Sequence, residues 1–179
     1  FDTNNKYGVF TKNHKGLIEA LKLVKDKGYT FDLILVGKDL NESNQALIKQ
    51  IKKSNLYDST YLLDQRSDIA DIMNALDIHI LSSAYGEGFP NVVAEAMACG
   101  TPCIATNVGD SKKIIGSFGV VVLPNQVGEL ADAVVSLLEC MKDDTKWSML
   151  KRDGTNHINK NFSIDEMVLN YKNVWSEKV

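Results

Sequence analysis

The apolar residues of this chain follow two different spacings that alternate along the sequence. Between residues 14 and 27 they recur every three or four positions, which predicts a helix with one apolar face. Residues 31–36 form a short and almost continuous apolar run that stops at Gly37, as expected of a strand buried on both faces. The pattern therefore predicts a helix followed by a strand.

The same alternation continues to the end of the chain and closes with three helices. Further helices are expected around residues 47–51, 68–75, 91–99, 127–141, 147–158 and 164–175, and strands at 60–63, 78–81, 102–106 and 120–123. Strands separated by helices of this length form βαβ units with a parallel sheet. The expected fold class is α/β, with a Rossmann-like, doubly wound parallel sheet flanked by helices.

Length and composition limit the interpretation to one ordinary globular domain. The 179 residues include 44% hydrophobic and 24% charged residues, and the net charge is -3. This balance argues against nucleic acid as a partner, because such proteins carry a basic face. No apolar stretch reaches the length of about 18 residues expected of a membrane span. The three cysteines have no metal-ligand spacing, so we interpret them as thiols in a reducing compartment.

The loop that follows the strand at 78–81 carries the most informative chemistry. Ligands of such sheets bind beyond the carboxyl ends of the strands, and the two glycines in this loop permit a close backbone approach. Pro90 suits the first position of the next helix. The amides of Asn91, Val92 and Val93 then point out of the helix start, where the dipole favours an anion.

The helix after this loop has an apolar arc and a polar face. At about 100° per residue, five residues share the arc that we expect to face the core: Val92, Val93, Ala96, Met97 and Cys99. Asn91 and Glu95 share another face. Glu95 is the only charge of an apolar helix, and ribose hydroxyls are suitable partners for it. The alternatives are that Glu95 is exposed or pairs with a lysine, and that Glu87 is a loop acid favoured by the helix dipole.

Residues 87–102 resemble the EX7E motif of the family 4 retaining glycosyltransferases, whose two Rossmann-like domains form the GT-B fold. The resemblance extends to the strand-to-loop segments of that family, which correspond to residues 12–20, 36–37, 76–83 and 105–110. It implies that residues 1–179 are one half of a GT-B protein, the C-terminal nucleotide-sugar-binding domain, and that the N-terminal acceptor domain is absent.

The resemblance also implies roles for individual residues. Glu87 would contact the transferred sugar as the catalytic residue, Glu95 would hold the ribose hydroxyls, and Lys12 would neutralise the diphosphate. The backbone that lines the sugar and diphosphate would be that of Gly88, Phe89, Pro90, Asn91 and Val92, although Pro90 has no N–H to donate. The alternative for Lys12 is an ordinary surface lysine.

Arg66 lies in the loop that, by the same resemblance, runs near the nucleotide base. Ser67 or Asp68 is more simply the N-cap of the helix that follows. The chain departs from the family pattern in having no Arg before Lys12. We therefore expect the first strand and its Arg to lie upstream of Phe1.

The resemblance implies retaining glycosyl transfer from a nucleoside-diphosphate sugar to a glycan, polysaccharide or lipid-linked acceptor, which the absent domain would bind. It implies no cofactor and no divalent metal, and a cytoplasmic protein whose full-length form sits at the inner face of the membrane. The isolated chain is expected to be inactive. Two alternatives stay open: a module that only binds a sugar nucleotide, and a GT-B-type epimerase.

Overall fold

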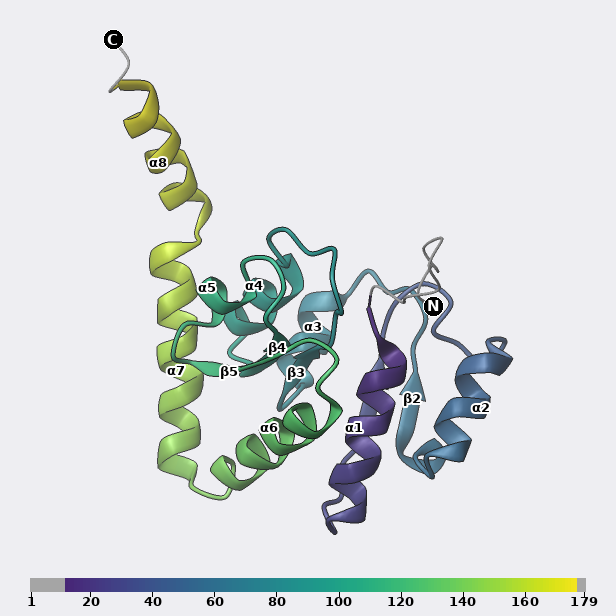
Figure 1. The fold of residues 1–179 in the computed structure, drawn as a ribbon. Coiled ribbons are helices and arrows are strands. Elements are labelled where there is room, and N and C mark those ends of the chain that lie inside the picture. Colours follow the sequence, from purple (N-terminus) through teal and green to yellow (C-terminus); the bar gives the residue numbers. More distant parts are fainter. Residues whose placement is uncertain (1–11, 177–179) are drawn as a thin grey trace.

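The computed structural model describes residues 12–176 of the chain (Figure 1). Its strands are β1 (Leu33–Leu35), β2 (Thr60–Leu62), β3 (His79–Leu81), β4 (Cys103–Thr106) and β5 (Gly119–Val122). Its helices are α1 (His14–Asp26), α2 (Gln45–Lys53), α3 (Ile69–Ala75), α4 (Asn91–Ala98), α5 (Ser111–Ile115), α6 (Val127–Cys140), α7 (Asp144–Asn161) and α8 (Ile164–Ser176), with a 3-10 turn at Tyr57–Ser59. The predicted helices and strands occur in the predicted order, and α5 between β4 and β5 is a further helix.

Helices cover both faces of the parallel strands, as expected of a doubly wound fold. The central strand β4 is buried along its whole length. Its Ile104 packs into one apolar core together with α1 and α6. Cys103 and Ala105 point to the opposite face and pack into a second core with α4 and α5. The alternation of side chains along a strand thus divides the apolar interior into two layers.

The strands form two separate parallel sheets among the described residues, whereas the sequence suggested one. β1 pairs with β2, and β3, β4 and β5 pair in that order. A cavity of about 930 Å³ lies between the two groups and is lined by residues of both β1 and β3. Because those two strands do not pair with each other, the sheet is divided there.

The helices α1, α2 and α7 begin where a short polar side chain accepts a hydrogen bond from an amide of the first turn. Asn13 accepts a hydrogen bond from the N–H of Gly16 at the start of α1 (3.1 Å). Asp143 accepts one from the N–H of Lys146 (3.0 Å). This cap starts α7 at Asp144, three residues earlier than the apolar pattern indicated.

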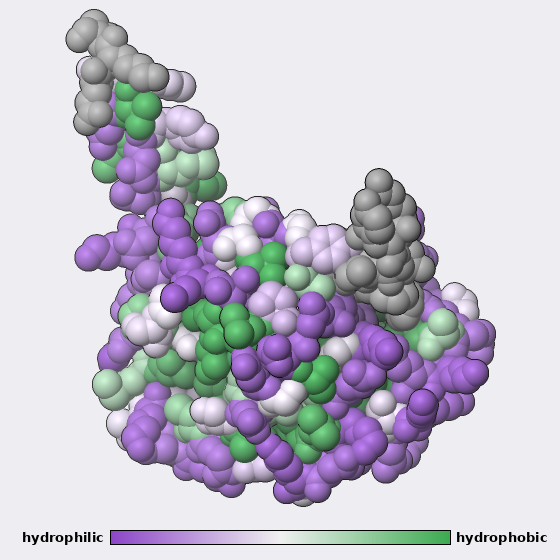
Figure 2. All heavy atoms as spheres, in the orientation of Figure 1, coloured by the Kyte–Doolittle hydropathy of each residue, from purple (hydrophilic) through white to green (hydrophobic). Residues whose placement is uncertain are grey.

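The C-terminal helix α8 extends away from the rest of the chain in Figure 1 and has no buried residue. Several large apolar side chains are exposed along it: Ile164, Met167, Val168, Leu169, Tyr171, Val174 and Trp175. Figure 2 shows apolar surface on this projecting helix. Between residues 12 and 176, no helix has both the length and the apolar character needed to cross a membrane.

Two leucines on α1 provide a matched test of the core between α1 and α6. Leu21 is 3% exposed, whereas Leu23 is 40% exposed on the same helix. We expect Leu21→Ala to lower the free energy of unfolding by about 2–5 kcal/mol, because it leaves a cavity in a packed core. Leu23→Ala should cost below about 1 kcal/mol. Urea denaturation of both variants measures the difference, and an equal loss of stability in the two variants would contradict the burial of Leu21 in the core between α1 and α6.

Candidate functional site

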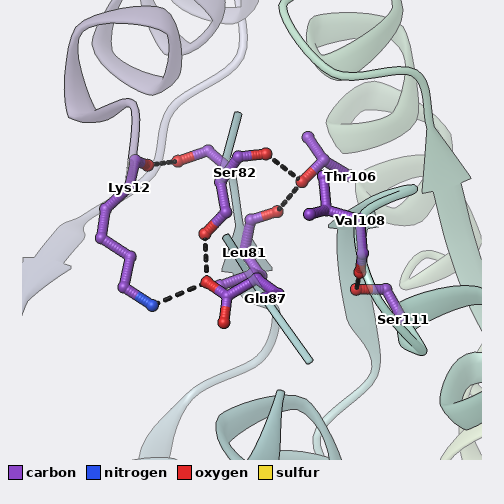
Figure 3. Close-up of polar contacts among 8 residues, drawn as sticks. Lys12, Leu81, Ser82, Glu87, Thr106, Val108 and Ser111 are labelled. Carbon is purple, nitrogen blue, oxygen red and sulfur yellow. Dashed lines mark hydrogen bonds and ion pairs between the residues drawn. The ribbon is translucent and has the colours of Figure 1, made fainter. Parts of the chain in front are cut away.

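Three hydroxyl groups fix the chain where β3 and β4 end. Ser82 donates its hydroxyl to the carbonyl oxygen of Lys12 (2.8 Å). Thr106, at the end of β4, donates to the carbonyl oxygen of Ser83 (2.6 Å). Ser83 in turn donates to Oε1 of Glu87 (2.6 Å). As Figure 3 shows, these contacts bring residues from distant parts of the sequence around one carboxylate.

Glu87 is the centre of this arrangement. Its carboxylate also accepts a hydrogen bond from Nζ of Lys12 (2.7 Å), and its side chain is 12% exposed against 50% for Lys12. Burial raises the pKa of the Glu87 carboxyl, but the hydrogen bonds from Lys12 and Ser83 outweigh burial and hold this pKa below its ordinary value. Glu87 is therefore ionised at neutral pH and held in one orientation.

The loop that contains Glu87 rests on the turn after β4. The N–H of Asp110 donates to the carbonyl oxygen of Gly88 (2.8 Å). Gly109 adopts a positive φ of 57°, and a Cβ there would lie 2.2 Å from the same Gly88 oxygen. Only glycine fits at this position, because both its backbone conformation and the space it occupies exclude a side chain.

The helix α4 begins at Asn91, as the apolar pattern predicted, but the prediction that Pro90 takes its first position was wrong. Pro90 is the N-cap, with φ -73° and ψ 89°, and is not the first helical residue. The N–H of Val93 donates to the Pro90 carbonyl oxygen (3.0 Å), so the prediction that this amide is free was wrong. The amides of Asn91 and Val92 have no acceptor among the described residues. These two amides remain available at the positive end of the helix dipole.

The apolar arc of α4 is narrower than predicted. Val93 and Met97 are buried together with Ala96, but Val92 is 38% exposed. Glu95 is exposed on the same side as Asn91, and its carboxylate has no hydrogen bond or ion pair among the described residues. The expectation that its carboxylate sits in apolar surroundings was therefore wrong, and the alternative of an exposed Glu95 is confirmed.

Arg66 and Asp68 pair with each other in the loop after β2. Nε and Nη2 of Arg66 donate to the two carboxylate oxygens of Asp68 at 2.8 and 2.5 Å. Asp68 occupies the N-cap position of α3, but its side chain makes no capping hydrogen bond. The prediction that Ser67 or Asp68 is the N-cap is confirmed for Asp68, but its carboxylate is bound by the Arg66 guanidinium and not by an amide of α3. Among the described residues, Arg66 makes no contact with the Glu87 cluster.

Sequence reasoning assigned no role to three residues that organise this site: Ser83, Thr106 and Gly109. Their position in the sequence could have identified them, because each follows or ends a strand at the edge of the sheet where ligands of such folds bind. The site combines an ionised carboxylate, an ammonium group and free helix amides. Such a combination can bind an anion beside a hydroxylated group. The expected first strand and Arg upstream of Phe1 lie outside the described residues.

The chain is similar in sequence and in structure to known proteins. The family model for "Glycosyl transferases group 1" matches residues 8–153. The chain is 29% identical over 172 residues to the UDP-Gal:alpha-D-GlcNAc-diphosphoundecaprenol alpha-1,3-galactosyltransferase of Escherichia coli. The match covers 94% of this chain and 43% of that relative.

Two solved structures share the fold over nearly the whole chain. A glycosyltransferase from Rickettsia africae superposes with a TM-score of 0.83 at 25% identity, over 94% of this chain and 45% of that one. HepE from Anabaena in complex with UDP superposes with a TM-score of 0.77 at 26% identity, over 93% and 45%. The chain therefore spans less than half of the length of the relatives it matches.

Replacing Gly109 tests whether the turn after β4 supports the loop. We expect Gly109→Ala to lower the free energy of unfolding by more than about 1 kcal/mol, because the methyl group collides with the Gly88 carbonyl and the positive φ is strained. Gly128→Ala is the control, since a Cβ there has no atom within 4 Å. Thermal unfolding of both variants measures the difference, and similar melting temperatures would contradict the close contact.

The ion pair of Glu87 predicts a pH dependence of stability. The pKa of Glu87 is lowered on folding from its ordinary 4.5, so its stabilising contribution is complete above that value and is lost as the pH falls through the folded pKa. We expect Glu87→Gln to cost about 1 kcal/mol at pH 7, because Lys12 is half exposed and solvent weakens the pair. The cost should decline below pH 4.5.

Urea denaturation across this pH range measures the effect. Glu19→Gln, which removes a carboxylate from the exposed face of α1, is the control. A cost for Glu87→Gln that stays constant into acid would show that charge at Glu87 contributes nothing.

Proposed function

The chain belongs to the glycosyl transferases group 1 family, and we propose that it is the nucleotide-sugar-binding domain of a retaining glycosyltransferase. The observation that carries this proposal is the placement of Glu87 and Lys12 against each other, 2.7 Å apart, next to the free amides at the start of α4. A nucleoside-diphosphate sugar presents the matching groups in order: hydroxyls on the sugar, two charged phosphates, and hydroxyls on the ribose.

The diphosphate would lie at the N-terminus of α4. The amides of Asn91 and Val92 have no acceptor among the described residues and carry the positive end of the helix dipole. Lys12 is half exposed, so its ammonium group can turn from Glu87 towards a phosphate without leaving the site. The three donors together would neutralise the charge that the diphosphate brings.

The transferred sugar would lie between Glu87 and the loop residues Gly88 and Phe89. Glu87 is ionised and accepts hydrogen bonds, as a group that orients sugar hydroxyls must. The backbone of Gly88 has no atom within 4 Å of where a Cβ would be, so the loop leaves room for a ligand on this side. Pro90 is buried and has no N–H to donate to the ligand.

The ribose would lie beside Glu95, one turn further along α4. Glu95 shares the exposed side of the helix with Asn91, about 6 Å further along the axis. Its carboxylate has no partner among the described residues, so both oxygens can accept from the two hydroxyls of a ribose. Arg66, in the loop after β2, would have to leave Asp68 in order to reach the base.

The chemistry follows from the charges that develop during transfer. The bond between the anomeric carbon and the diphosphate oxygen breaks, and its electron pair goes to the diphosphate. Lys12 and the α4 amides stabilise that charge because they are already oriented. Glu87 stabilises the cationic sugar while an acceptor hydroxyl forms the new bond and gives its proton to the leaving diphosphate. We propose that the configuration of the sugar is retained and that no divalent metal or cofactor takes part.

The acceptor would be bound by a further domain. The relatives are more than twice as long as the chain, and the unpartnered apolar side chains of α8 are suited to packing against another part of a protein. We therefore propose that the 179 residues bind the donor but do not transfer it alone. We also propose a cytoplasmic protein that meets a glycan or lipid-linked acceptor at the inner face of the membrane.

Calorimetry on the chain tests the donor site. We expect it to bind at least one of UDP, GDP and ADP, and Glu95→Ala to weaken the binding by about tenfold or more, because a ribose would lose hydrogen bonds to a charged group. Glu19→Ala removes a carboxylate from the middle of another helix and should leave the affinity unchanged. Wild-type affinity in Glu95→Ala would exclude the ribose role, and no binding of any nucleotide would exclude the donor site.

An assay of the full-length protein distinguishes glycosyl transfer from epimerisation of the nucleotide sugar. Incubated with a nucleotide sugar and no acceptor, an epimerase would produce a changed sugar, which the proposal excludes. Release of nucleoside diphosphate only when a glycan or lipid-linked acceptor is added is the expected result.

A further inference from the structure

The helix α7 lies alongside α4 and contacts it at both ends. Thr155 donates its hydroxyl to the carbonyl oxygen of Met97 in the last turn of α4 (3.0 Å). Seven residues further along, Phe162 packs its ring against Phe89, which lies just before α4 (5.7 Å between ring centroids). The two helices therefore run in opposite directions, and α7 holds both the end of α4 and the loop that precedes it.

The contact at Phe89 adds an apolar side-chain contact to the hydrogen bond that the N–H of Asp110 donates to the Gly88 carbonyl oxygen. Phe89 is 42% exposed, and its neighbour Gly88 has no atom within 4 Å of a Cβ position. Gly86 adopts a positive φ of 80°. Two glycines give the loop many accessible conformations. The ring of Phe89 is the one large apolar side chain between Gly86 and Pro90, and Phe162 is the ring against which it rests.

Phe162 is itself held in place from behind. The ring of His157 meets it edge-on (5.6 Å between centroids). Nε2 of His157 is 3.0 Å from the carbonyl oxygen of Ile114 at the end of α5. The N–H of Phe162 donates to the Ile158 carbonyl oxygen (2.8 Å). Phe162 therefore presents a fixed surface to Phe89.

We propose that Phe162 is a positioning residue for the donor site. Its ring fixes Phe89, and Phe89 fixes the backbone from Gly88 to Asn91 whose amides face the sugar and diphosphate. This inference rests on the proposed function of that loop. Phe162 touches no substrate and acts only through Phe89. Its loss would leave a nucleotide sugar to order the loop on binding, which weakens affinity.

The test compares two aromatic residues of the same cluster. Phe162→Ala removes the ring that meets Phe89, whereas Phe118→Ala removes a ring that meets only His157 within that set. We expect Phe162→Ala to bind the preferred nucleoside diphosphate about three- to tenfold more weakly. Phe118→Ala should bind like the wild type, and Phe162→Tyr, which keeps the ring, should restore the affinity. Phe162→Leu replaces the alanine variant if that variant does not fold.

Two further measurements separate positioning from a general loss of stability. Amide hydrogen exchange over residues 86–92, without nucleotide, should be faster in Phe162→Ala and unchanged in Phe118→Ala. In Phe89→Ala, adding Phe162→Ala should weaken binding no further, because the contact is already lost.

The outcomes distinguish this inference from the proposed function. If the wild type binds nucleotide and Phe162→Ala matches it in both affinity and exchange, the positioning role is wrong while the donor site stands. If Phe118→Ala has the same effects as Phe162→Ala, the cluster only stabilises the fold and the inference is overturned. If the wild type binds no nucleotide, the proposed function fails, and the exchange measurement still decides whether Phe162 orders the loop.

Discussion

The hydrogen bond from Ser83 to Glu87 is the contact on which the candidate site depends. Ser83 is buried at the end of β3, and Thr106 fixes its carbonyl group from β4. The Ser83 hydroxyl therefore approaches Glu87 from a fixed position, and the carboxylate it orients holds Lys12, 75 residues away in the sequence. Ser82 also contacts Lys12, because its hydroxyl donates a hydrogen bond to the Lys12 carbonyl oxygen. Residues at the ends of the parallel strands β3 and β4 thus determine the positions of the Lys12 and Glu87 side chains.

This fixed pair lies beside a helix end whose amides are unmatched, and the combination favours an anionic ligand. An Asp at the N-cap can accept from an amide of the first turn, as Asp143 does from Lys146 in α7. α4 has Pro90 as its N-cap, which has no side-chain acceptor, and among the described residues the amides of Asn91 and Val92 are unpaired. An incoming phosphate would provide the missing acceptor.

Much of the fold follows from apolar spacing, because periodicity reports which side chains a helix or strand buries. The pattern identified α1 and β4 within a residue or two, and the glycine-rich loop before Asn91 located the site. The division into two sheets was not predictable, since spacing along one strand carries no information about its neighbour. The exposure of Val92 and Glu95 depends on which side of α4 packs against the core, and spacing along one helix does not show how wide that side is. Asp68 was assigned to the helix it precedes because sequence alone does not show that Arg66 competes for it.

The closing helices, which the sequence presented as a tail without strands, have a structural role at the site. Thr155 and Phe162 lie on one side of α7 at a separation that matches the length of α4, so a single helix contacts both ends of another. Gly154 lies at this contact, where a Cβ would meet Phe118 and Met97 at the ordinary van der Waals distances of 3.4 and 3.6 Å. The chain leaves the body as α8 directly after Phe162. Because α8 begins two residues after Phe162, a protein surface that covered its exposed apolar side chains would lie close to the ring that contacts the loop.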